Sequence, residues 1–124
     1  MIKDCPFCKM EKSWLQNEHA LAFKDSFPIS EGHTLVIPKQ HVKSMFDLPA
    51  EVQQSLWTLV ADVRNHLSDE LSPDAFNIGV NDGGAAGQTV SHAHIHVIPR
   101  YNGDVLDPRG GVRWIIPEKA VYWP

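Results

Sequence analysis

The sequence predicts an α+β fold: a mostly antiparallel, five-stranded sheet with one long helix and one or more short helices. Two observations support this prediction. Short apolar runs rich in β-forming residues alternate with turn residues, and a single segment has the periodicity of a long helix. The chain has 124 residues, which is enough for one core, so we expect a single domain over residues 1–124.

Five segments are predicted to be strands because they are apolar and are bounded by turn residues. They are residues 14–16, 20–24, 34–37, 75–80 and 90–98. Pro38 and Pro99 follow the third and the fifth segment, and we expect those two strands to end there. The order of elements shows no regular alternation of strand and helix, which favours antiparallel pairing.

The long helix is predicted over about residues 49–69. Pro49 suits its first turn, and the run Ser72-Pro73-Asp74 ends it. Apolar side chains recur there at steps of three and four residues and form one stripe, made of Val52, Leu56, Leu59, Val60, Val63 and Leu67.

Charge and composition exclude several classes of partner. The formal net charge of -4 gives no electrostatic reason to expect a long nucleic acid or an anionic membrane as a partner. No run of apolar residues is long enough to predict a membrane-spanning helix, and residues 1–10 lack the apolar core of a signal peptide. The two closely spaced cysteines suggest a reducing compartment, so we expect a cytoplasmic protein.

The most informative motif is the run HAHIH at residues 92–96, in the last predicted strand. Side chains alternate between the two faces of a strand, so the three histidines share one face and Ala93 and Ile95 point to the core. A solvent-exposed face rich in histidine is the simplest interpretation. Three imidazoles at a period of two favour chemistry instead, either metal binding or nucleophilic and acid-base catalysis.

The residues before the histidines favour catalysis on a phosphate group. The glycine-rich loop at residues 81–87 can present backbone N–H groups to an anion, and Gln88 and Thr89 add further donors. The loop is also compatible with an ordinary turn, and it lacks the Lys-Ser/Thr pair of a P-loop. Because the glycine-rich loop comes just before the histidines in the sequence, it predicts a phosphate bound next to them.

The run GQTVSHAHIHVI at residues 87–98 resembles the signature of the histidine triad (HIT) family of nucleotide hydrolases and transferases. Family-like motifs also occur in order at residues 22–25, 32–39 and 81–83. The resemblance covers about residues 5–104 and leaves the tail at 105–124 without a role. It implies a HIT-like antiparallel fold, a homodimer, and a small nucleotide substrate such as a dinucleoside polyphosphate or a nucleoside phosphoramidate.

The family mechanism implies a role for each matching residue. His94 resembles the nucleophile that attacks the α-phosphorus to form a nucleotidyl-histidine, which water then hydrolyses. His96 is expected to contact the phosphate and help the leaving group depart, and His92 completes the catalytic set. The matching substrate positions are Gln88 and Thr89 for the phosphate, Asp25 for the ribose, Phe7 and Phe23 for the base, and Asn81 at the phosphate end of the base slot.

Several of these residues also have a plain structural interpretation. From composition alone, Phe7 and Phe23 are equally compatible with the core, and Asp25 with a turn. Gln88 and Thr89 are compatible with an ordinary entry into a strand.

The second motif is Cys5-x-x-Cys8, which is compatible with redox chemistry, with half of a zinc site, or with two buried thiols. Redox activity needs a thioredoxin-like context that the sequence lacks, and a zinc site needs two more donors. Some HIT proteins and the related galactose-1-phosphate uridylyltransferases bind zinc with such a pair and two histidines. The resemblance therefore implies a structural zinc on Cys5, Cys8, His41 and His92, with His33 as the alternative third ligand.

Two other functions compete with an enzyme of this family. A zinc-stabilised nucleotide-binding or regulatory module would keep the pocket without turnover. A catalytic metal held by His92, His94 and His96 together is disfavoured, because same-face residues of a strand lie roughly 7 Å apart and do not converge on one ion.

Overall fold

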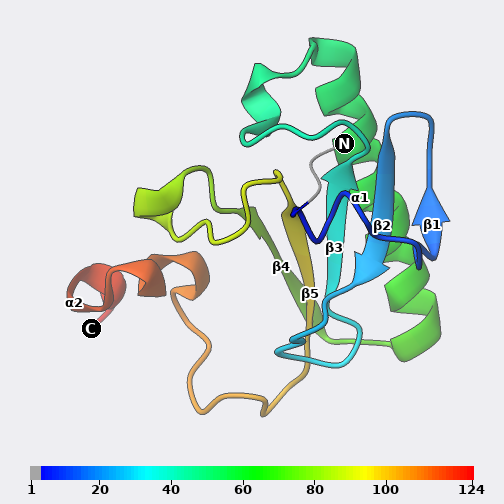
Figure 1. The fold of residues 1–124 in the computed structure, drawn as a ribbon. Helices are drawn as coiled ribbons and strands as arrows, with labels where there is room; N and C mark the ends of the chain where they lie inside the picture. The colour runs from blue at the N-terminus through cyan, green and yellow to red at the C-terminus, as the bar shows by residue number, and fades with distance from the viewer. Residues whose placement is uncertain (1–3) are drawn as a thin grey trace.

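The computed structural model describes residues 4–124; residues 1–3 of the expected domain and of the N-terminal segment lie outside the described residues. Five strands form one sheet in the order β1-β2-β3-β5-β4, and each neighbouring pair is antiparallel (Figure 1). The strands are β1 (Leu15–Gln16), β2 (Ala20–Lys24), β3 (Thr34–Pro38), β4 (Ala75–Val80) and β5 (Ile95–Arg100). The predicted fold class is confirmed.

One face of the sheet is covered by the long helix α1 (Ala50–Leu71) (Figure 1). The predicted helix is thus correct, with ends one and two residues away from those expected. Pro49 is the N-terminal cap, and Ser72 ends the helix in the left-handed conformation with its N–H bonded to Ser68. The apolar stripe of α1 is buried against the sheet through Leu56, Leu59, Val60, Val63 and Leu67.

The prediction that Pro38 and Pro99 lie beyond the strands is wrong. Pro38 is the last residue of β3, and Pro99 lies inside β5. The pairing of β5 with β3 reaches only Val97, so at Pro99 the strand has β4 alone as a neighbour. A proline is tolerated where one side of a strand has no partner, because its missing N–H leaves no gap in a ladder.

The start of the last strand is also corrected. The predicted strand 90–98 begins only at Ile95, because the residues before it leave the sheet and the N–H of Ala93 donates to Val42. His92 and His94 therefore precede β5. The expected alternation survives in this segment, since Ala93, Ile95 and Val97 are buried in the core that includes α1.

Four short helices complete the structure of residues 4–124. They are η1 (Met45–Asp47), η2 (Gly84–Ala86), η3 (Gly111–Ile115) and α2 (Pro117–Ala120). The last two belong to the C-terminal tail, which lies on the β4 side of the sheet (Figure 1). No helix within the described residues is both long and apolar enough to cross a bilayer.

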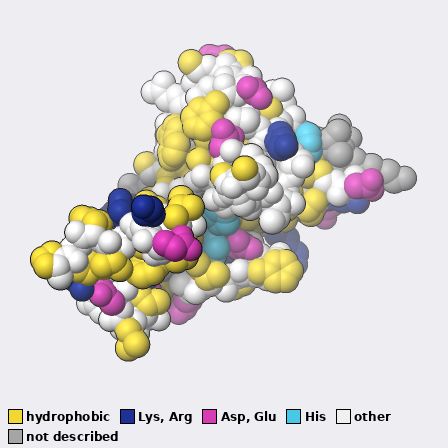
Figure 2. Space-filling model, turned by 90° about the vertical axis from the view of Figure 1, so that its left-hand side faces the viewer, with side chains coloured by type: hydrophobic (Ala, Val, Ile, Leu, Met, Phe, Trp, Pro, Cys, Tyr) yellow, Lys and Arg dark blue, Asp and Glu magenta, His cyan; other side chains and the backbone are white. Residues whose placement is uncertain are grey.

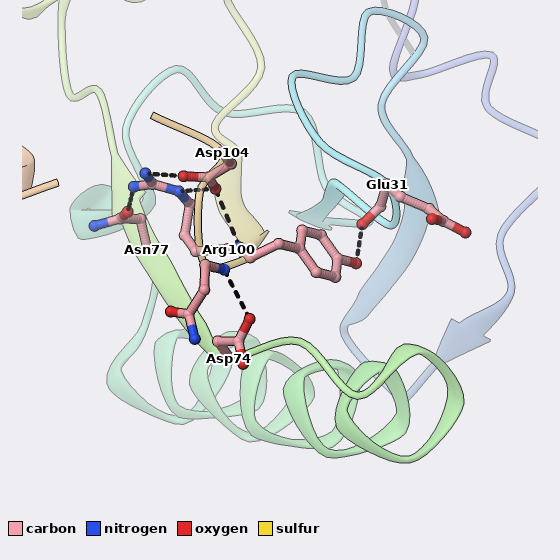
Figure 3. A network of polar contacts seen from close by, with 7 residues as sticks. Glu31, Asp74, Asn77, Arg100 and Asp104 are labelled. Carbon is pink, nitrogen blue, oxygen red and sulfur yellow. Dashed lines mark hydrogen bonds and ion pairs between the residues drawn. The ribbon is translucent and has the colours of Figure 1, made fainter. Parts of the chain in front are cut away.

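A polar network fixes the turn between β5 and the tail (Figure 3). Arg100 donates to both carboxylate oxygens of Asp104, at 2.7 and 2.8 Å, and to Asn77 at 2.6 Å. The Arg100 guanidinium holds the pKa of the Asp104 carboxyl well below its usual range. The Tyr101 hydroxyl donates to the carbonyl of Glu31 at 2.8 Å, and together these bonds set the direction in which the tail leaves the sheet.

Candidate functional site

The described part of the chain brings histidines together in two clusters, one with the cysteines and one with an aspartate. Cys5, Cys8, His41 and His92 form the first, and Asp25, His33 and His96 form the second. Within each cluster, the potential ligand atoms lie within 4.8 Å of one another. His94 belongs to neither cluster and lies in the sequence between His92 of the first and His96 of the second. The centroid of its ring lies 5.3 Å from that of His96.

The first cluster has the geometry of a four-ligand metal site. The Nδ1 atom of His92 lies 3.5 Å from each cysteine sulfur, and that of His41 lies 3.2 Å from the sulfur of Cys8. In a tetrahedral zinc site with ordinary bond lengths, a sulfur and a nitrogen ligand are about 3.5 Å apart. The donors present therefore fit zinc. The structure places His41 here, whereas His33 lies in the other cluster.

His92 is held in the form that a metal ligand needs. Its Nε2 lies 2.8 Å from the carbonyl oxygen of Pro38, which can only accept, so Nε2 carries the proton and Nδ1 offers its lone pair to the cluster. Burial lowers the pKa of the fully buried His92 ring, which keeps it neutral.

The second cluster fixes the proton positions of two more histidines. The backbone N–H of Ile29 donates to Nδ1 of His33, so the proton of this neutral ring is on Nε2. That nitrogen lies 2.9 Å from Nδ1 of His96 and 3.4 Å from a carboxylate oxygen of Asp25. Burial lowers the pKa of His33, although the Asp25 carboxylate opposes this effect.

His96 is accordingly a neutral ring with its Nε2–H free to donate. Its Nδ1 accepts from His33, which leaves the proton on the opposite nitrogen. Burial, followed by the neighbouring His94 and His33, lowers the pKa of His96 to about 4. At neutral pH this ring can serve as a hydrogen-bond donor to an anionic group.

His94 has the arrangement expected of a nucleophile. Its Nδ1 lies 2.8 Å from the carbonyl oxygen of His92, so Nδ1 carries the proton and Nε2 keeps a lone pair. The side chain is 7% exposed and packs against the rings of Phe7 and His96. A buried and oriented imidazole with its Nε2 lone pair available can attack an electrophile.

A cavity of about 870 Å³ opens beside His96, which is the size of a small-molecule site. Asp25, His33, Asn77, Asn81 and His96 supply its polar wall. Its apolar wall includes Ile29 and Ile98 and, from the tail, Val112, Ile115 and Ile116. Figure 2 shows histidine side chains reaching the surface near the centre of one face, beside apolar side chains. His94 does not line this cavity; its ring packs against the ring of His96, which does.

The structure gives the two predicted phosphate-binding residues different surroundings. The side-chain oxygen of Gln88 accepts from the N–H of Gly83 at 2.9 Å, and its nitrogen donates to the carbonyls of Lys43 and Val90. Gln88 therefore ties the glycine-rich loop to neighbouring backbone. Thr89 is exposed at the surface.

The two predicted base-binding phenylalanines lie together on the face of the sheet opposite α1. Phe23 is only 2% exposed and packs with Leu35 and Ile37, so it offers almost no free surface. Phe7 packs on Phe23 with ring centroids 5.3 Å apart and lies over His94.

Sequence reasoning did not identify three contributors to this site. They are the N–H of Ile29, the carbonyl of Pro38 and the apolar wall formed by the tail. The two backbone groups have no signature in the sequence, because every residue carries a carbonyl and nearly every one an N–H. The apolar residues Val112, Ile115 and Ile116, interrupted by Arg113, were the signal available for the tail.

Comparison with known proteins places the chain in a family. The family model described as HIT domain matches residues 9–103. A HIT-like protein of Mycoplasma pneumoniae is 43% identical over 86 residues, which are 69% of this chain and 60% of that protein. The adenylylsulfatase HINT3 of Arabidopsis thaliana is 36% identical over 109 residues, which are 83% of this chain and 55% of that protein.

A solved structure agrees with these matches. The crystal structure of a zinc-bound histidine triad family protein from Mycobacterium smegmatis is 37% identical, with a TM-score of 0.75 over 84% of this chain and 80% of that one. The family model covers most of the chain, and the sheet, the helix and the histidine run agree with it. The chain belongs to the histidine triad (HIT) family.

Proposed function

We propose that this protein is a nucleotide hydrolase or transferase that cleaves at the α-phosphate of its substrate through a covalent nucleotidyl-histidine on His94. The substrate class is a nucleoside phosphoanhydride of the dinucleoside polyphosphate type, or a nucleoside phosphoramidate. The observation that supports this proposal most strongly is the bond from the Nδ1–H of His94 to the carbonyl of His92, which leaves the Nε2 lone pair available. Membership of the HIT family and the name adenylylsulfatase of one relative are consistent with it.

The first step transfers the nucleotidyl group to the protein. The lone pair on Nε2 of His94 forms a bond to the α-phosphorus, and the bond from phosphorus to the leaving group breaks with its electron pair on the leaving atom. Positive charge develops on the His94 ring, where the carbonyl of His92 stabilises it through the Nδ1–H bond at 2.8 Å. The Nε2–H of His96 donates a hydrogen bond to the negative charge that develops on the phosphate or the leaving group.

The second step releases the product. Water attacks the phosphorus, the bond to Nε2 breaks, and its electron pair returns to the ring while one water proton passes to solvent. The products are a nucleoside monophosphate and the free enzyme. A transferase would use another nucleophile in place of water.

The remaining site residues are proposed to bind the nucleotide. The Asp25 carboxylate lines the cavity and can accept from ribose hydroxyls, and the Asn81 amide faces the same space. Gln88 supports the phosphate site by holding the loop from Gly83, and Thr89 adds a hydroxyl next to it. The base is proposed to lie against Phe7, with Phe23 behind it.

Zinc is the proposed structural cofactor, on Cys5, Cys8, His41 and His92. Four protein ligands leave no open position for water, so the metal would supply no chemistry to the reaction and would tie the N-terminal segment to His92.

A homodimer is the proposed assembly. Large apolar side chains are exposed on the tail and on β4, where a second copy could cover them; they include Ile78, Val112, Ile115 and Ile116. Sedimentation equilibrium of the wild-type protein should give twice the mass of the chain. A monomer at micromolar concentration would contradict the dimer.

Substitution of the nucleophile tests the proposed reaction. His94→Asn should lower the release of nucleoside monophosphate about a thousandfold or more, while nucleotide affinity changes little, because the ring acts on the phosphorus and not on the base or ribose. His66→Asn, at an exposed histidine of α1, is the matched control. Rapid quenching of the wild-type reaction should trap a nucleotide on His94 by mass spectrometry.

The outcome separates an enzyme from a nucleotide-binding module. Undiminished hydrolysis by a folded His94→Asn protein contradicts the proposed role of His94. Tight nucleotide binding without turnover on any substrate of either type, and without a trapped intermediate, would instead identify a regulatory module.

A further inference from the structure

Phe7, proposed above to contact the base, also makes contacts that base binding does not explain. It lies between the two cysteines of the first cluster, in the segment Cys5-Pro6-Phe7-Cys8, which we call the cysteine loop. Its ring contacts three others, with centroid distances of 5.1 Å to His94, 5.3 Å to Phe23 and 6.0 Å to His92. One side chain thus joins the cysteine cluster to the proposed nucleophile.

We propose that Phe7 is a positioning residue: the cysteine loop holds its ring against the His94 imidazole, so that closure of the Cys/His cluster and orientation of His94 are linked. The proposal deepens the proposed function, on which its kinetic part rests. According to this proposal, the Cys/His cluster affects the orientation of His94 as well as the stability of the fold.

The contact with His94 restricts rotation of the imidazole. The two rings meet at 85°, so that one ring presents its edge to the face of the other. The Nδ1 bond to the His92 carbonyl and the packing of His96 hold other sides of the same ring. Without Phe7, one of these three restraints is lost. The Nε2 lone pair of His94 then points at the phosphorus for a smaller fraction of the time. An aromatic contact of this kind corresponds to roughly a 2- to 10-fold change in an equilibrium.

The position of Phe7 depends on the cluster as well as on its packing against Phe23, because within residues 4–124 the hydrogen bonds from the cysteine loop to distant segments are those of the cluster. The N–H of Cys8 donates to the sulfur of Cys5 at 3.4 Å, and the N–H of Met10 donates to the carbonyl of Phe7 at 3.2 Å. These bonds are local, whereas His41 and His92 join the loop to distant parts of the chain. A metal on the four donors would therefore fix the loop, and the loop carries Phe7.

The experiment compares Phe7→Ala and Phe7→Leu with the wild type, each with zinc and after treatment with a chelator. Phe46→Ala is the matched control, because Phe46 is an exposed phenylalanine in η1. Zinc content, nucleotide affinity, kcat and KM are measured for each protein. The tautomer and line width of the His94 ring are measured by proton–nitrogen NMR without any nucleotide.

For zinc-loaded Phe7→Ala we expect kcat to fall about 5-fold, by more than KM changes, and the Nδ1-protonated signal of His94 to broaden or decrease. Phe7→Leu should recover part of both effects, and Phe46→Ala should show neither. Chelation of the wild type should reproduce the NMR change, and it should add little to Phe7→Ala, because both act through one contact. If Phe7→Ala does not fold, the same comparison is made with Phe7→Leu.

Unchanged His94 signals in zinc-loaded Phe7→Ala and Phe7→Leu overturn the inference, as does a full and additive effect of chelation on Phe7→Ala. A rise in KM alone would leave Phe7 as a base-binding residue only. The NMR result does not depend on turnover, so it remains decisive even if His94→Asn proves fully active and the proposed function fails.

Discussion

His96 should make the stability of the folded protein depend on pH in a predictable way. Its pKa is lowered from 6.5 to about 4, first by burial and then by His94 and His33. Between these two values, the unfolded chain binds a proton at this position and the folded protein does not. The free energy of unfolding must therefore rise with pH across this window and fall as the solution is made acidic.

The size of the effect follows from the two pKa values. Since each pKa unit corresponds to about 1.4 kcal/mol, the full contribution of His96 is roughly 3 kcal/mol, lost once the pH is below about 4. Between pH 7.5 and pH 5 the same two values give a loss of about 2 kcal/mol. The ring is partly open to the cavity, which makes this figure an upper estimate.

Urea unfolding at several values between pH 7.5 and pH 5 measures this loss, for the wild type and for His96→Asn at equal zinc concentration. Both proteins keep the four residues of the cysteine cluster, so proton-linked release of metal affects them alike. The wild type should lose about 2 kcal/mol more than the variant over this range. Parallel pH dependences for the two proteins would refute the reasoning about His96.

Three further predictions concern the scaffold of the site. Gly32→Ala should lower the free energy of unfolding by roughly 2–4 kcal/mol, because a Cβ on this residue, at φ +92°, would lie 2.6 Å from the Leu71 side chain. Its control is Gly84→Ala, which has open space around it and should change the free energy of unfolding by less than about 0.5 kcal/mol in the same urea titration. Gln88→Ala should speed hydrogen exchange at the Gly83 amide by about tenfold, since that amide loses its acceptor, and an unchanged exchange rate would show that the loop is held by other groups. Cys8→Ser should reduce zinc from about one ion per chain to a small fraction and lower the thermal midpoint by several degrees, as measured by metal analysis and calorimetry; retention of tight stoichiometric zinc would exclude Cys8 as a ligand.

The features that could be predicted from the sequence are those set by local periodicity. The apolar stripe of α1 and the alternation of Ala93, Ile95 and Val97 with the histidines both follow from the geometry of one segment. The ends of the strands could not be predicted from local periodicity. Pro99 continues β5 because β3 is no longer beside it, and residues before Ile95 leave the sheet because Ala93 bonds to Val42.

The sequence by itself determined that histidines, cysteines and a glycine-rich loop supply the chemistry of this protein. The tertiary structure decided how they are grouped. His33 and His41 flank β3, one before and one after it, so a single strand separates them and only His41 reaches the cysteines while His33 meets His96. Which ring nitrogen carries a proton was decided by the N–H of Ile29 and the carbonyls of Pro38 and His92. Such backbone groups are the same in every residue, so only folding, which brings distant segments together, gives them a specific role.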